Sequence, residues 1–141
     1  MPKIQPHDGQ PVAQVRQWSV GRVLVAELHG EVDFASGPAV AGRLDRLTAR
    51  RRPLLVLDLR PVTFIDCAGL AVLCRARRRV RVRGGRLALV IHDPRVLRVL
   101  DLVGLSTAFD VHGGLDEALA AHGATADGHR LTALSRAVQP G

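Results

Sequence analysis

The sequence contains 141 residues, of which 47% are hydrophobic, so it is long enough and apolar enough for one globular domain with its own core. Its formal net charge is +7 and 19 of its 20 basic residues are Arg, a balance that indicates either an acidic partner or a genome rich in arginine codons. Aromatic residues make up only 3%, which argues against a stacking surface for single-stranded nucleic acid. No apolar run reaches the roughly 18 residues of a membrane-spanning helix, and no hydrophobic signal segment opens the chain, so a cytoplasmic protein is expected.

Hydrophobic periodicity predicts an alternation of strands and helices. Residues 15–33 alternate apolar and polar side chains around Gly21 and predict two adjoining strands. The predicted elements that follow are a helix (36–53), a strand buried on both faces (54–59), a helix (67–83), a buried strand (87–91), a helix (93–104), a strand (107–111) and a short helix (113–123).

This order predicts a single α/β domain over residues 14–122. The alternation implies a mixed β-sheet of four to five strands, about four helices and right-handed crossovers between parallel strands. Residues 1–13 and 123–141 lack clear periodicity, and we expect them to be a flexible N-terminal segment and a flexible C-terminal tail.

The sequence shows no residue pattern typical of an enzyme or a metal site. Its six His are scattered without the spacing of metal ligands, and neither a G-x-S-x-G elbow nor a phosphate-binding glycine loop occurs. Cys67 and Cys74 would lie about 10 Å apart along one helix, too far for a disulfide, and are interpreted as small apolar residues. Gly113 and Gly114 could hold an anion at a helix start, but a plain turn is the preferred interpretation. We expect a protein that is not an enzyme, with no metal and no cofactor.

Arginines crowd the polar face and the end of the helix predicted at 67–83. Near a helix C-terminus they complement the helix dipole, which favours a solvated face, and an acidic partner surface is the alternative. No recognisable DNA-reading motif accompanies them, so no direct nucleic-acid binding is expected. The cluster consists of Arg75, Arg77, Arg78, Arg79, Arg81, Arg83 and Arg86.

Two acidic turns follow predicted strands and precede predicted helices. In the first turn, Asp33 lies shortly before Ser36, a candidate N-cap. In the second, Asp66 is placed to cap the next helix by accepting the backbone N–H of Ala68 or Gly69. Such turns can meet at one edge of an α/β sheet and form a common surface, although the spacing alone also fits a simple strand–turn–helix junction.

The segments LHGEVDFASG (28–37) and LLVLDLRPVTFIDCAGLAVL (54–73), in this order and spacing, resemble the STAS domain and, more narrowly, the bacterial anti-sigma factor antagonists. The resemblance covers about residues 15–122. It implies a STAS-like fold and a binding module that engages a kinase-fold anti-sigma factor and thereby releases a sigma factor for transcription. We expect a monomer or weak dimer. The contact surface implied by the resemblance consists of Asp33, Ser36, Asp66, Cys67, Ala68, Gly69 and Leu70.

The sequence departs from the family pattern at the phosphoacceptor position. In the family, the kinase-fold anti-sigma factor phosphorylates a Ser or Thr directly before the glycine that corresponds to Gly69, and the antagonist then dissociates from it. That position is Ala68 here and Cys67 precedes it, so neither carries the acceptor hydroxyl. We predict binding without the usual phosphorylation switch, unless the switch has moved to Ser36, Thr63 or Ser106.

Two alternatives remain open. A redox role for Cys67 is possible on chemical grounds, because a helix N-terminus lowers the pKa of a thiol. The alternative function is that of a STAS accessory subunit of a transporter ATPase or of another signalling complex.

Overall fold

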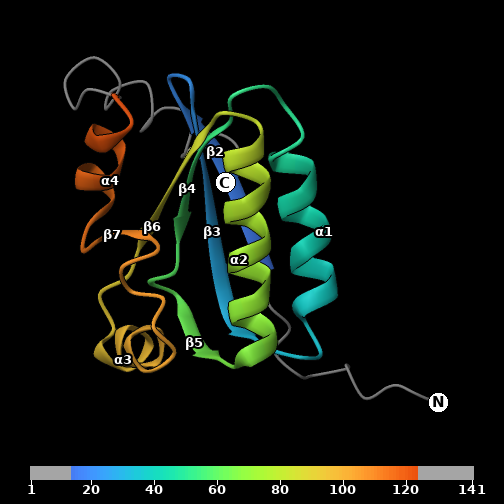
Figure 1. Ribbon diagram of the computed structural model, residues 1–141, viewed down its shortest axis with the longest axis vertical. Coiled ribbons are helices and arrows are strands. Elements are labelled where there is room, and N and C mark those ends of the chain that lie inside the picture. The colour runs from blue at the N-terminus through green and yellow to red at the C-terminus, as the bar shows by residue number, and fades with distance from the viewer. Residues whose placement is uncertain (1–13, 124–141) are drawn as a thin grey trace.

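The computed structural model describes residues 14–123 (Figure 1), so the predicted N-terminal segment and the predicted tail beyond residue 123 lie outside the described residues. The strands are β2 (Gln14–Val20), β3 (Val23–Val32), β4 (Leu54–Asp58), β5 (Val62–Ile65), β6 (Arg86–Val90) and β7 (Asp110–His112). The helices are α1 (Gly37–Leu47), α2 (Cys67–Val82), α3 (Pro94–Leu102) and α4 (Leu115–Ala121).

The described strands form one mixed sheet in the order β2-β3-β4-β6-β7, with β5 paired to β3 beside this path. β2 runs antiparallel to β3, whereas the β3–β4, β4–β6 and β6–β7 pairs are parallel. The predicted α/β class and mixed sheet are therefore confirmed. Helices connect the parallel strands, as expected for crossover connections.

The short strand β5 was not predicted from the sequence. Only Val62 and Ile65 at its two ends are buried, so it carries neither a clear alternation nor a long apolar run. β3 can pair with it because β3 extends beyond β4 and its register shifts at Gly30, whose positive φ of 87° suits glycine. This pairing places the end of β3 beside the chain that leads into α2.

The prediction of a strand over residues 107–111 was partly wrong. The strand begins only at Asp110, because residues 106–108 form a turn in which the Ala108 N–H donates to the Leu105 carbonyl at 3.0 Å. Phe109 turns its side chain into the core and is 7% exposed. Ala108 and Phe109 therefore contribute to the core without strand pairing, whereas Val111 pairs with Leu89.

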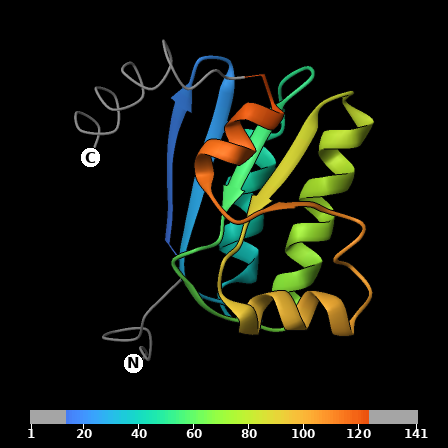
Figure 2. The same cartoon turned by 90° about the vertical axis from the view of Figure 1, so that its left-hand side faces the viewer.

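Helices cover both faces of the sheet (Figures 1 and 2). On β3, Leu24, Ala26 and Leu28 belong to the larger core cluster beneath α1 and α2. Val23 and Val25, the alternate residues, belong to the smaller cluster beneath α4. This period of two is the reason that β3 is apolar on both faces.

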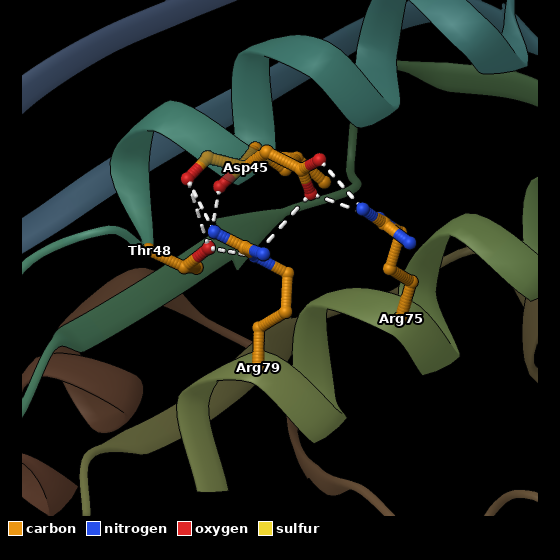
Figure 3. Close-up of polar contacts among 5 residues, drawn as sticks. Asp45, Thr48, Arg75 and Arg79 are labelled. Carbon is orange, nitrogen blue, oxygen red and sulfur yellow. Dashed lines mark hydrogen bonds and ion pairs between the residues drawn. The ribbon is translucent and has the colours of Figure 1, made fainter. Parts of the chain in front are cut away.

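A polar clasp joins α1 to α2 (Figure 3). Asp45 on α1 accepts two hydrogen bonds of 2.9 Å from the guanidinium of Arg75, and its Oδ1 lies 3.3 Å from Arg79 Nε. Arg79 also donates to the hydroxyl of Thr48 at 2.9 Å. The hydrogen bond from Arg75 is the main cause that lowers the pKa of Asp45 below its ordinary value. Two members of the arginine cluster thus hold the helix pair together.

We expect Asp45→Asn to lower the free energy of unfolding near neutral pH by about 1 kcal/mol or less, because partly exposed ion pairs are screened by solvent. A carboxylate with a lowered folded-state pKa stabilises the protein above its unfolded pKa, and that contribution is lost as the pH falls through the folded pKa. The difference between wild type and variant, measured by urea unfolding, should therefore shrink between about pH 5 and pH 2. Asp101→Asn, at an exposed position on α3, is the matched control. A difference that stays constant over this range would contradict the role of the Asp45 charge.

Candidate functional site

The two acidic turns meet at the carboxylate of Asp66. Its Oδ1 accepts the backbone N–H of Gly69 at 3.0 Å, which confirms the predicted cap at the start of α2. Its Oδ2 accepts the backbone N–H of Phe34 at 3.2 Å, from the loop between β3 and α1. One side chain therefore caps a helix and ties a second loop to it. The end of β3 and the start of α2 lie at the lower end of the molecule in Figure 1.

The loop between β3 and α1 is closed by Asp33 and Ser36. Asp33 Oδ1 accepts the backbone N–H groups of Ala35 at 3.1 Å and Ser36 at 3.0 Å. The hydrogen bond from the Ser36 backbone is the largest of the effects that lower the pKa of Asp33, so this carboxyl remains charged at neutral pH. The Ser36 hydroxyl donates to the Glu31 carbonyl at 2.7 Å and accepts from the Asp33 N–H at 3.0 Å. Ser36 occupies the predicted N-cap position, but its side chain fastens the loop and does not cap α1.

Gly69 allows the first turn of α2 to lie directly against the end of β3. A Cβ at this position would collide with the Val32 carbonyl oxygen and lie 2.7 Å from Ile65 Cγ1. Any side chain would push α2 away from β3, and with it the cap that holds Phe34. The glycine of the second turn is therefore required by close backbone contact.

Burial divides the residues expected at the contact surface into two groups. Ser36 at 5% exposure and Leu70 at 6% are buried, and Gly69 is buried as well, so these three support the surface from below. Cys67 is an exposed free thiol at the start of α2. The outer side chains are those of Asp33, Phe34, Asp66, Cys67 and Ala68, which we call the loop surface.

The sequence reasoning missed two exposed phenylalanines near this site. Phe34 is 83% exposed and Phe64 is 50% exposed. A large apolar side chain in a loop whose backbone is held by hydrogen bonds is a common mark of a protein contact. For Phe34, the sequence signal of an exposed position was its place directly after Asp33, because it belongs neither to the strand before it nor to the helix after it.

Within residues 14–123, no group of three or more His, Cys, Asp or Glu is arranged to hold a metal ion. In the same part of the chain, no helix has the length and apolar character needed to span a membrane.

Comparison with known proteins gives consistent matches. The family model of the STAS domain matches residues 17–118. The chain is 33% identical over 84 residues to an anti-sigma F factor antagonist of Paenibacillus polymyxa, covering 59% of this chain and 72% of that protein. It is 30% identical over 118 residues to the anti-sigma-F factor antagonist RsfA of Mycobacterium tuberculosis, covering 84% of each. The crystal structure of an anti-sigma factor antagonist from Mycobacterium paratuberculosis superposes with a TM-score of 0.72 at 28% identity, covering 78% of this chain and 93% of the other.

We expect alanine substitutions at Gly69 and Gly42 to change the free energy of unfolding in opposite directions. We expect Gly69→Ala to lower the free energy of unfolding by about 2 kcal/mol or more, because its methyl group would overlap backbone atoms of β3. Gly42→Ala on α1 meets nothing within 4 Å and should raise it by about 0.5–1 kcal/mol, since Ala is the better helix former. Urea unfolding of both variants tests this, and a Gly69→Ala variant as stable as wild type would refute the close contact.

Proposed function

Since the chain belongs to the STAS domain family, we propose that it acts as an anti-sigma factor antagonist, which binds a kinase-fold anti-sigma factor and so frees a sigma factor for transcription. The observation that carries the proposal is the double hydrogen bond of Asp66, which fixes two loops as one surface. The relatives named above support an anti-sigma factor as the partner, because both are named as anti-sigma F factor antagonists.

The chemistry of the loop surface suits a protein partner. Phe34 offers a large apolar side chain whose backbone is already fixed, so little conformational entropy is lost when a partner covers it. Burying a side chain of this size contributes about 1.5–3 kcal/mol. Cys67 and Ala68 are small, which allows the partner to approach the start of α2 closely. The carboxylates of Asp33 and Asp66 add specificity for hydrogen-bond donors on the partner.

We further propose that the complex is not released by phosphorylation at the start of α2, because Ala68 provides no hydroxyl. A phosphate there would add about −1.5 to −2 charges, which an acidic patch on the partner would repel. Each pair of unit charges at 4 Å costs about 4 kcal/mol at an effective dielectric of 20, enough for a large loss of affinity. Ser36 is a poor replacement acceptor because it is buried and its hydroxyl is already hydrogen-bonded.

A charge placed at residue 68 should weaken partner binding. We expect Ala68→Glu to raise the dissociation constant for the anti-sigma factor by about tenfold or more, with little change in the thermal midpoint. Ala120→Glu adds the same charge at an exposed position on α4 and should leave affinity unchanged. Equilibrium binding of both variants gives the answer, and an unchanged affinity of Ala68→Glu would exclude the start of α2 from the interface.

A hydroxyl placed at residue 68 should restore the switch. Incubated with the kinase-fold partner and ATP, the wild-type chain should remain unphosphorylated, whereas Ala68→Ser should take up one phosphate and lose affinity. Phosphopeptide mapping by mass spectrometry distinguishes the two. Stoichiometric phosphate on wild-type Thr63, Ser106 or Ser36 would show that the switch has moved, contrary to the proposal. A chain that binds no kinase-fold anti-sigma factor would favour the accessory-subunit alternative.

A further inference from the structure

The arginine cluster divides into two groups with different surroundings. Arg75 and Arg79 turn toward α1 and bind Asp45 (Figure 3). Arg77, Arg78 and Arg81 instead line open hollows on another part of the surface of α2. The predicted solvated face therefore describes only part of the cluster.

The two hollows adjoin at Arg77 and Arg81, and together we call them the arginine groove. The first has a volume of about 390 Å³ and lies between α2, the start of β6 and the turn before β7. The second has a volume of about 530 Å³ and shares Arg77 and Arg81 with the first. The lining residues that decide its chemistry are Arg77, Arg78, Arg81, Arg86, Phe109 and Asp110.

Arg77 is held in place before any ligand binds. Its Nε donates to the Ala108 carbonyl at 2.8 Å, and its guanidinium carbon lies 5.9 Å from the centre of the Phe109 ring. The hydrogen bond uses Nε and leaves the two terminal nitrogens of the fork to donate elsewhere. Arg77 is thus a fixed cationic donor at the centre of the arginine groove.

The neighbouring cations are not neutralised within the described residues. Arg78 and Arg81 are exposed, and between residues 14 and 123 no carboxylate forms an ion pair with either. Asp110 is the acidic residue of the lining, and its Oδ1 lies 3.0 Å from His112 Nε2. The lining thus contains one carboxylate, that of Asp110, and four guanidinium groups, so the groove retains a strong positive potential. The guanidinium groups are those of Arg77, Arg78, Arg81 and Arg86.

We propose that the arginine groove binds a compact anion that carries several phosphate charges. Guanidinium forks match phosphate oxygens in pairs, and Arg77 and Arg81, four residues apart, are offset by about 6 Å along the helix, a spacing that suits linked phosphates. Phe109 is only 7% exposed beneath Arg77, so it offers no open ring on which a base could stack. The ligand is therefore recognised through its phosphates.

This site lies beyond the proposed function. Cys67 and Arg81 are separated by 14 residues of α2, or about 20 Å along its axis, so the groove and the loop surface can be occupied independently.

The test measures the affinity of the full chain for inorganic tripolyphosphate by isothermal titration calorimetry at low salt. We expect binding by wild type and a loss of about tenfold or more in the double variant R78S/R81S. The double variant R22S/R98S removes the same charge from exposed positions elsewhere and should stay within about twofold of wild type. Asp110→Asn should strengthen binding, and ATP should bind no more tightly than tripolyphosphate.

Several results would overturn the proposal. The first is that wild type does not bind tripolyphosphate. The second is that both double variants lose the same affinity, because such a loss would reflect net charge alone. Tighter binding of duplex DNA, of anionic lipid vesicles or of a Glu-rich peptide than of tripolyphosphate, with loss in R78S/R81S, would assign the groove to a different class of partner. Circular dichroism of each variant confirms that it is folded before its affinity is compared.

Discussion

The carboxylate of Asp66 is the interaction on which the arrangement of the site depends. Its two oxygens accept one backbone N–H each, from Gly69 in its own helix and from Phe34, which lies 32 positions earlier in the chain. An asparagine at this position has a single acceptor oxygen and could keep only one of these bonds. The acid at residue 66 therefore supplies a direct link between the loop after β3 and the start of α2 that an asparagine could supply only in part.

Four further features of the structure support this arrangement. The pairing of β5 with the end of β3 brings residue 66 beside the first loop, and the absence of a side chain at Gly69 lets α2 rest on the Val32 carbonyl. The buried Ser36 hydroxyl closes the first loop on itself. Farther along the helices, Asp45 joins α1 to α2 through Arg75. The loop surface is therefore held in one arrangement by contacts within the chain itself, as the proposed binding role requires.

Much of the fold followed from the sequence because it depends on local patterns. The apolar runs of β4 and β6, the amphipathic helices and the Asp66 cap are each determined within a few residues, and all were predicted. The missed features depend on contacts distant in sequence. β5 is too short to show a periodicity, the bond from Phe34 to Asp66 joins two separate loops, and the division of the arginine cluster depends on Asp45 in another helix. Burial also depends on distant contacts, because no residue near Ser36 in the sequence indicates that its hydroxyl faces inward.

We propose that the two loops act as a single contact surface. Hydrogen–deuterium exchange of the full chain, alone and in complex with a kinase-fold anti-sigma factor, reports the protection of each loop separately. We expect residues 33–36 and 66–70 to become protected together in the complex, and both to lose this protection in parallel in Asp66→Asn. Protection confined to one of the two loops, or to the arginine-lined part of α2, would contradict it.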